Sequence, residues 1–133
     1  MGYFNQYVRA ESLEEAYGLY QKKNNFVLGG MLWLKMRKRP FGTAIDLSDL
    51  GLDQIEEDEK EFRIGAYVSL RELETNEALN TYTKGAFAES VKHIVGVQFR
   101  NVASVGGSLW GRYGFSDVMT IFRAMGAKVQ LHH

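Results

Sequence analysis

The sequence contains no cysteine, and this absence excludes several kinds of site at once. Without thiols, the chain forms no disulfide, holds no zinc ion through thiolates and carries no iron–sulfur cluster on cysteine ligands. An excess of charge of either sign is also lacking, because 16 Lys and Arg residues balance 16 Asp and Glu residues. Proteins that are steered onto nucleic acid normally carry a basic surplus, so binding of DNA or RNA is a poor first hypothesis.

Long apolar runs and the common nucleotide motifs are lacking as well. The first residues, MGYFNQYVRAESLEEA, have neither the basic start nor the apolar run of a secretory signal, and no window is long enough for a membrane span. We therefore expect a cytoplasmic protein. The chain contains no P-loop (GxxxxGK[ST]), and neither of its glycine pairs belongs to a dinucleotide fingerprint (GxGxxG). Its 133 residues, of which 45% are apolar, suffice for one core or two small, joined ones.

The first fifty residues predict a small α/β unit. Ser12 and Glu15 have the spacing of a capping box, and the apolar residues that follow recur at helical spacing, which predicts a helix over about residues 12–23. The other elements expected here are short strands at residues 7–8, 26–28 and 44–47 and a second helix over residues 31–36. We expect this unit to form a domain over residues 1–51.

From residue 52 the pattern is typical of an α+β arrangement, which we expect to form a second domain over residues 52–133. The acidic stretch EEDEKE is predicted to be the solvated turn between two antiparallel strands, and Ser69 with Glu72 repeats the capping-box spacing. Further elements predicted here are a helix over residues 85–95, a strand over 102–105 and a helix over 117–125 that Ser116 caps and Gly126 ends. The last residues, GAKVQLHH, are expected to form a strand with no element after it. Either the chain is a fragment, or His132 and His133 belong to a tag.

Two glycine pairs follow short apolar segments, Gly29–Gly30 after FVL and Gly106–Gly107 after VASV. Adjacent glycines cost backbone entropy on folding, and they are tolerated where φ must be positive or where another group must come very close. Glycine-rich turns also expose backbone N–H groups, and a following helix adds positive potential, so such turns suit a phosphate or pyrophosphate. Each pair alone is more often a structural turn than a binding loop.

The order of four blocks resembles the FAD-binding subunit or domain of the molybdenum hydroxylases, such as xanthine dehydrogenase and carbon monoxide dehydrogenase. The blocks are FVLGGMLWLKMR, TAIDLSDLGLDQI, FRIGAYVSLREL and VGVQFRNVASVGGSLWGRYGFSDVMTIFRAMGAKVQL, of which QFRNVASVGGS is the most specific part. The resemblance implies an α+β fold in which a small α/β subdomain precedes a larger α+β one, with FAD extended between them. Members of this family continue beyond the last block, so the chain is expected to be truncated relative to them.

The resemblance also implies which residues contact FAD. Its pyrophosphate would lie under both glycine loops, Asp117 would contact the nucleotide, and Ile94 would lie beside the isoalloxazine ring. The loop residues concerned are Phe26, Val27, Leu28, Gly29, Gly30, Met31, Leu32 and Trp33 in the first loop and Ser104, Val105, Gly106, Gly107 and Ser108 in the second. The sequence departs from the family at Met31 and Leu32, where many relatives carry a polar pair, and at Ser108, where asparagine is common.

Several of these residues also have plainer explanations. Asp117 in the first turn of a helix is favoured by the helix dipole without any ligand. Trp110, Tyr113 and Phe115 could stack on a ring, yet aromatic residues beside a glycine turn more often belong to a core or cover it, so they stay unassigned.

The implied function is a flavin electron-transfer module of a hydroxylase complex that acts on a purine or similar heterocycle. A molybdenum subunit and an iron–sulfur subunit are then the expected partners, and NAD or another molecule is the acceptor. Such a module needs no side-chain nucleophile and no metal ligand, because the cofactor carries the electron chemistry. The alternative is a non-catalytic subunit-interaction domain that has lost flavin binding. Gly107→Val is predicted to abolish flavin binding while leaving the fold largely intact.

Overall fold

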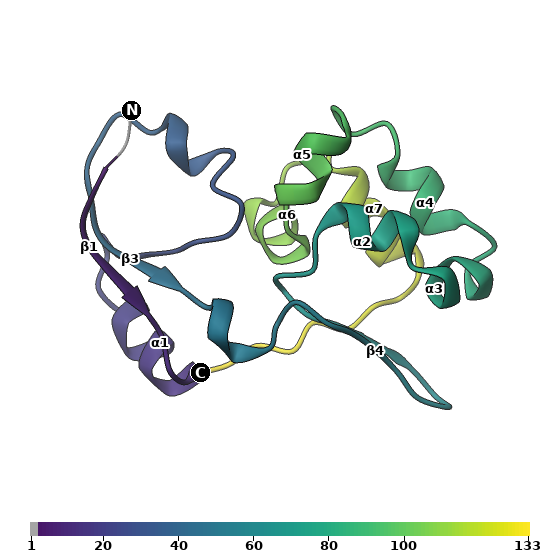
Figure 1. Ribbon diagram of the computed structural model, residues 1–133, viewed down its shortest axis with the longest axis horizontal. Helices are drawn as coiled ribbons and strands as arrows, with labels where there is room; N and C mark the ends of the chain where they lie inside the picture. The colour runs from purple at the N-terminus through teal and green to yellow at the C-terminus, as the bar shows by residue number, and fades with distance from the viewer. Residues whose placement is uncertain (1–2) are drawn as a thin grey trace.

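The computed structural model describes residues 3–133, in which a small parallel sheet is followed by a hairpin and a group of short helices (Figure 1). The strands are β1 (Phe4–Arg9), β2 (Phe26–Val27), β3 (Phe41–Asp46), β4 (Ile55–Glu57) and β5 (Phe62–Ile64). The helices are α1 (Leu13–Tyr20), α2 (Leu70–Thr75), α3 (Glu77–Tyr82), α4 (Ala86–Val91), α5 (Val97–Val102), α6 (Val105–Gly111) and α7 (Asp117–Ala124), with 3₁₀ turns η1 (Leu34–Met36) and η2 (Ser48–Leu50). The predicted α+β class is confirmed. No helix in this part of the chain has the length and apolarity that crossing a bilayer requires.

The parallel sheet has the order β1-β3-β2, so the last strand in sequence lies in the middle. A central parallel strand is covered on both faces and therefore needs apolar residues in succession. Residues Phe41, Ala44 and Ile45 of β3 are accordingly buried. Helix α1 packs on this sheet through Ala16, which joins a small cluster with Ala10 and Ile45. The carboxyl ends of β2 and β3 lie at the same edge, and the first glycine pair begins there.

The start of α1 is as predicted, but its end is not. The Ser12 hydroxyl accepts a hydrogen bond from the Glu15 N–H (3.1 Å), whereas the Glu15 carboxylate accepts from the N–H of Glu11 (2.9 Å). The helix ends at Tyr20 because buried Asn25 draws the chain back to the sheet. Its amide donates to the Leu19 carbonyl and accepts from a β3 backbone N–H, both at 2.8 Å.

Three predicted elements of the chain are wrong. Residues 31–36 form only the turn η1, because Met31 adopts a left-handed φ of 60° that interrupts a helix. Residues 102–105 do not form a strand, since α5 ends at Val102 and α6 begins at Val105; the bridge between Ser69 and Ser104 is their only strand-like pairing. The tail over residues 127–133 forms no strand, and it runs back towards α1 (Figure 1).

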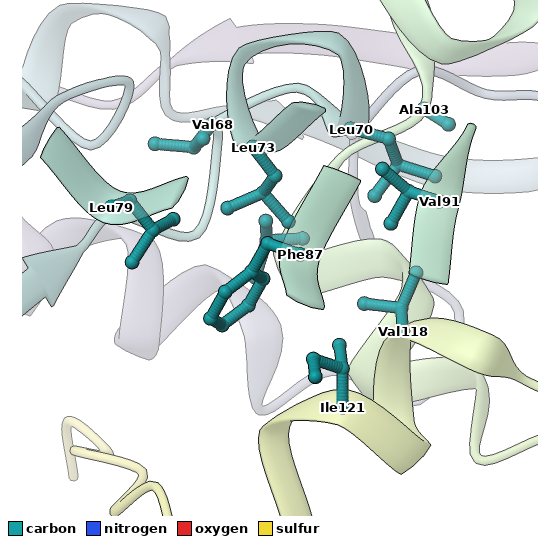
Figure 2. Close-up of a cluster of buried hydrophobic side chains, with 10 residues drawn as sticks. Val68, Leu70, Leu73, Leu79, Phe87, Val91, Ala103, Val118 and Ile121 are labelled. Atoms are coloured by element: carbon teal, nitrogen blue, oxygen red, sulfur yellow. The ribbon is translucent and has the colours of Figure 1, made fainter. Parts of the chain in front are cut away.

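The second half of the chain is built around one apolar cluster. The predicted antiparallel hairpin β4–β5 and the Ser69–Glu72 capping box of α2 are confirmed. The helix predicted over residues 85–95 is shorter than expected, because only the residues of α4 are helical. Helix α3 is not predicted from the sequence. Side chains of α2, α3, α4 and α7 converge in Figure 2, and the cluster consists of Val68, Leu70, Leu73, Leu79, Phe87, Val91, Ala103, Val105, Val118 and Ile121. This cluster is separate from that of the sheet.

Candidate functional site

The first glycine pair lies against the segment that precedes the second pair, although the two are far apart in sequence. A Cβ added to Gly30 would lie only 2.2 Å from the carbonyl oxygen of Val102, and one added to Gly29 would lie 2.8 Å from the hydroxyl oxygen of Ser104. Neither glycine has a positive φ. The first pair is therefore required by a close approach of two backbone segments, and the structural explanation of Gly30 holds whether or not a ligand binds there.

The first glycine loop carries a run of free backbone donors. Leu28 donates its N–H to the Ile45 carbonyl at 2.8 Å, and Lys35 donates to the Met31 carbonyl at 3.0 Å. Between them, the N–H groups of residues 29–33 have no hydrogen-bond acceptor within residues 3–133. Met31 within this run holds a conformation that is uncommon for residues other than glycine. Consecutive free N–H groups around a left-handed residue are typical of anion-binding backbone concavities.

The second glycine pair is different, because its donors are already used by the fold. Val105 donates to the Val68 carbonyl at 2.9 Å, Gly106 donates to the Ala66 carbonyl at 2.8 Å, and Gly107 donates to the Ser104 hydroxyl at 3.1 Å. The sequence predicts free N–H groups at both pairs, and the structure shows them only at the first. The reason is that Gly106 and Gly107 lie in the first turn of α6, pinned to the segment before α2, rather than in a turn after a strand.

The two glycines of α6 also differ from each other. A Cβ on Gly106 would lie 2.8 Å from the Ala66 carbonyl oxygen, so the absence of a side chain permits the pairing with that segment. A Cβ on Gly107 would meet only the Ser104 hydroxyl, at 2.9 Å, and the residue is otherwise exposed. A larger side chain at Gly107 would therefore crowd this hydroxyl, which also lies next to Gly29 of the first loop.

A residue that sequence reasoning missed, Tyr67, fixes the first loop in place. Its hydroxyl donates to the Leu28 carbonyl and accepts from the Leu47 N–H, the latter at 2.9 Å. Burial raises the pKa of Tyr67, and the Leu47 N–H opposes that effect. Because Leu28 immediately precedes Gly29, this one hydroxyl ties the loop to the end of β3. No motif marks Tyr67 in the sequence, since its role arises from contacts across 39 and 20 residues.

The carboxylate at the end of β3 is already engaged by the protein. Asp46 accepts hydrogen bonds from the Tyr7 hydroxyl and from both the hydroxyl and the N–H of Ser48. Burial would raise the pKa of Asp46, but the hydrogen bonds from Ser48 and Tyr7 outweigh burial and lower this pKa. Asp46 is thus ionised, and its carboxylate is already hydrogen-bonded within the protein at the carboxyl end of β3.

Ile94 and Asp117 occupy different surroundings. Ile94 follows α4, packs half-buried against the helical cluster and accepts a hydrogen bond through its carbonyl from Arg100 (3.2 Å). Arg100 is itself buried and forms an ion pair with Glu74 (2.9 Å), so the segment around Ile94 is held rigidly. Asp117 is exposed in the first turn of α7, and its carboxylate makes no hydrogen bond or ion pair with residues 3–133.

Three aromatic side chains meet beside the first loop. The ring of Trp33 lies 5.6 Å from that of Tyr113, and Tyr113 stacks on Phe115 at 5.3 Å with an interplanar angle of 21°. The sequence alone leaves Tyr113 and Phe115 unassigned, because nothing local indicates that they reach a loop eighty residues earlier. The fourth aromatic residue considered from the sequence, Trp110, has no aromatic partner in the described part of the chain.

Comparison with known proteins identifies the family. Residues 3–133 match the FAD binding domain in molybdopterin dehydrogenase. A chain of Cu,Mo-CO dehydrogenase is 20% identical with a TM-score of 0.78, the match covering 92% of this chain and 45% of that one. A chain of carbon monoxide dehydrogenase from Hydrogenophaga pseudoflava is 26% identical with a TM-score of 0.66, covering 78% and 38%. A chain of quinoline 2-oxidoreductase from Pseudomonas putida 86 is 20% identical with a TM-score of 0.67, covering 81% and 38%.

Comparison with curated proteins gives no significant match. The chain spans less than half the length of the three solved structures described above. The family match covers nearly all of the chain, and the fold agrees with it. The protein therefore belongs to the family of FAD-binding domains of molybdopterin dehydrogenases.

Proposed function

We propose that this chain is the flavin electron-transfer module of a molybdenum hydroxylase complex and that it holds the pyrophosphate of FAD on its first glycine loop. The observation that carries the proposal is the run of free N–H groups over residues 29–33. Such groups stabilise a pyrophosphate only where no side chain intervenes and where the loop is fixed beforehand. Gly29 and Gly30 meet the first condition, and the Tyr67 hydroxyl meets the second.

Charge around the loop favours an anion. The segment that follows, residues 35–39, contains Lys35, Arg37, Lys38 and Arg39 and no acidic residue. None of these four forms an ion pair within residues 3–133. Arg37 lies over the rings of Phe26 and Phe41, with its guanidinium carbon 4.7 and 5.3 Å from their centroids. The segment thus leaves positive charge next to the free donors.

The remaining loop residues have narrower roles in this proposal. Phe26, Val27 and Leu28 form the strand end that carries the loop, and Ser104 caps α6 and lies next to Gly29. Gly107 and Ser108 border the bound nucleotide, Asp117 supplies an uncommitted carboxylate for its hydroxyl groups, and Ile94 offers an apolar side chain for the flavin ring. Arg100 holds Ile94 in position by donating a hydrogen bond to the Ile94 carbonyl.

Bound FAD would supply the transfer of electrons between iron–sulfur clusters of a partner subunit and NAD or another acceptor. The chain itself has no cysteine, so clusters and molybdenum cofactor belong to partner subunits in this proposal. A xanthine dehydrogenase-like complex that oxidises a purine or similar heterocycle is the proposed setting. The contribution of this chain is to bind and orient the cofactor, and no side chain here acts as an acid, a base or a nucleophile.

The second candidate function is a subunit-interaction domain without flavin. It is favoured by the occupied donors of Gly106 and Gly107, because only one of the two glycine loops presents free N–H groups. An absorbance spectrum of the purified chain and a titration with FAD separate the two functions. Saturable binding supports the flavin module, and absence of binding supports the interaction domain.

The site is tested with Gly107→Val, which places a branched side chain against the Ser104 hydroxyl that lies next to Gly29. We expect FAD binding to be lost while circular dichroism and thermal melting stay close to those of the parent. Gly18→Val is the matched control, since it puts the same side chain into α1, where no atom lies within 4 Å of the added Cβ. Unchanged affinity of Gly107→Val would exclude the second loop from the site.

A further inference from the structure

A shallow groove lies between the hairpin β4–β5 and helix α3, at the end of the molecule opposite the parallel sheet (Figure 1). The groove is lined by Glu57 of β4 and by Glu77, Ala78, Thr81 and Tyr82 of α3. The Tyr82 side chain is 74% exposed, although a tyrosine in a folded domain usually buries most of its ring. None of these residues belongs to either glycine loop, so the groove is a surface separate from the candidate flavin site.

The hairpin holds the Tyr82 ring in place at the groove. Glu57 and Phe62 are paired directly across the two strands, so their side chains lie on the same face of the hairpin. The ring of Tyr82 packs against that of Phe62, with the ring centroids 5.6 Å apart and an interplanar angle of 48°. Phe62 in turn packs against the helical cluster. Tyr82 is thus anchored on one side, while most of its ring stays in contact with water.

Helix α3 is fixed by side-chain hydrogen bonds at its start and in its middle. The Asn76 side chain accepts from the Leu79 N–H at 2.8 Å. The Asn80 amide donates to the carbonyls of Leu73 (2.8 Å) and Asn76 (2.9 Å). The same amide accepts from the N–H of Ala88 in α4 at 2.8 Å. The groove is therefore built on elements that are already ordered, which reduces the entropy that binding costs.

Two carboxylates beside the tyrosine ring have no cationic partner. Glu57 and Glu77 form no ion pair within residues 3–133. Arg63 of β5 pairs instead with Asp58 (2.8 Å) and Glu61 (2.9 Å) at the turn of the hairpin. Charge is thus compensated at the turn and left uncompensated at the groove. A cation that enters the groove can pair with these carboxylates and lie on the aromatic ring at the same time.

We propose that this groove binds an arginine side chain of a partner polypeptide, with the guanidinium plane on Tyr82 and its N–H groups donating to Glu57 and Glu77. Arginine fits better than lysine, because a flat guanidinium stacks on an aromatic ring and forms paired hydrogen bonds with a carboxylate. A polypeptide fits better than a small free cation, because exposed ion pairs contribute little until an interface excludes water. The inference does not depend on whether the chain binds FAD.

The probe is a short glycine–serine peptide that contains arginine, and its control is the same peptide with citrulline, which keeps the flat end of the side chain but has no charge. Both peptides are titrated into the ¹⁵N-labelled parent chain at low and at high ionic strength. We expect the arginine peptide to shift the backbone N–H signals of residues 57, 62 and 77–82 saturably. The citrulline peptide should leave them in place, and salt should weaken the binding of the arginine peptide.

Variants then locate the binding site. Glu77→Gln and Tyr82→Leu are each expected to weaken binding of the arginine peptide about threefold to fivefold. Tyr82→Phe keeps the ring and should stay close to the parent. Glu14→Gln is the matched control, since it removes an exposed carboxylate of α1 that forms no ion pair within residues 3–133. Circular dichroism checks that each variant keeps the helix content of the parent.

The parent chain alone already tests the assignment, whatever the stability of the variants. Equal binding of the citrulline peptide would overturn it, as would shifts confined to the turn over residues 58–61. An equal loss of affinity in Glu14→Gln would mean diffuse attraction between charges instead of a groove. Sedimentation velocity without peptide tests the other occupant, because self-association that Glu77→Gln abolishes would make the groove a contact between copies and overturn the partner assignment. Each of these failures leaves the proposed flavin function standing, since no step of the test uses FAD.

Discussion

At the scale of single residues, Gly30 has the most restricted position in the candidate site. Its missing side chain leaves room for the Val102 carbonyl oxygen. Because this oxygen belongs to the backbone, it cannot move away by a side-chain rotation. Gly29 faces a hydroxyl instead, and Gly18 in α1 faces open space. Three glycines of one chain therefore differ in what a methyl group would meet.

We expect Gly30→Ala to destabilise the chain by about 1–3 kcal/mol, the usual cost of forcing an extra carbon into a packed contact. Binding of FAD should weaken as well, because the loop with its free donors must shift. Urea denaturation and an FAD titration measure the two effects. Gly18→Ala is the control and should raise stability by up to about 1 kcal/mol, as alanine does in a helix interior. Equal stability of Gly30→Ala and the parent would mean that the two segments separate readily.

Tyr67 is the second residue whose role can be isolated. Tyr67→Phe keeps the ring and removes only the hydroxyl that bridges Leu28 and Leu47. Leaving the half-buried Leu28 carbonyl and Leu47 N–H without this partner should cost roughly 1–2 kcal/mol of unfolding free energy. The affinity for FAD should fall too, since Leu28 leads into the glycine loop. Tyr82→Phe, at an exposed tyrosine of α3, is the control and should change neither quantity. A loss of stability with unchanged affinity would show that the loop holds its shape without Tyr67.

At the scale of elements, the buried pair Glu74–Arg100 joins α2 to α5. Both side chains are largely buried, with 13% and 6% exposed. Burial would raise the pKa of Glu74, but the hydrogen bonds from Arg100 and Arg71 and the attraction of both guanidinium groups outweigh burial and lower this pKa. The carboxylate therefore binds a proton less readily in the folded chain than in the unfolded one. Its contribution to stability is complete above the ordinary pKa of about 4.5 and is lost as pH falls through the lower folded value.

Glu74→Gln should therefore reduce stability at pH 7 by about 3 kcal/mol, because Arg100 is left as a buried charge without its partner. The variant should also lose part of the decline in stability that the parent shows below about pH 4.5. Urea denaturation between pH 3 and pH 7 measures both. Glu89→Gln breaks an exposed pair with Lys92 and should change stability little. A parallel decline in Glu74→Gln and the parent would assign the acid sensitivity to other carboxylates.

Short sequence patterns correctly predict those elements whose start or end is determined by contacts between residues close together in the chain. The caps at Ser12, Ser69 and Ser116 lie where the spacing predicts them, because a cap involves residues three positions apart. The stretch around Val102 is apolar and β-branched, so it predicts a strand, yet it forms the end of α5. The residues after it, Ala103 and Val105, form hydrogen bonds with the segment that leads into α2, on either side of the bridge between Ser69 and Ser104. These contacts are not visible in a short window.

The same limit explains which parts of the candidate site could be predicted. The glycine pairs are visible in the sequence, but which of them has free donors depends on the segment that reaches Gly106 from Ala66. Tyr67, Tyr113 and Phe115 enter the site only through contacts between distant residues. Local spacing thus predicts the anion-binding chemistry, while the fold determines its geometry.

At the scale of the whole molecule, the sheet and the helical half are joined by the candidate site itself. Leu32 of the first loop packs against the helical cluster, Trp33 contacts Tyr113, and Tyr67 holds the ends of β2 and β3. Each half has its own small apolar cluster, and that of the sheet consists of only three buried residues with a few partly buried neighbours. We therefore expect neither half to be stable without these contacts.

The chain should unfold in urea as one cooperative unit. Tryptophan fluorescence, which reports the loop and α6, and far-ultraviolet circular dichroism, which reports all helices, should give the same midpoint. FAD at about 100 times its dissociation constant should raise the unfolding free energy by about 2.7 kcal/mol. It should shift both signals together, because the proposed site on residues 29–33 includes Leu32 and Trp33, whose contacts join the halves. ATP, which offers an adenine and phosphates but no flavin, is the control ligand and should cause a smaller shift. Two separate midpoints, of which FAD moves only one, would show that the halves fold independently and that the cofactor is held by one of them.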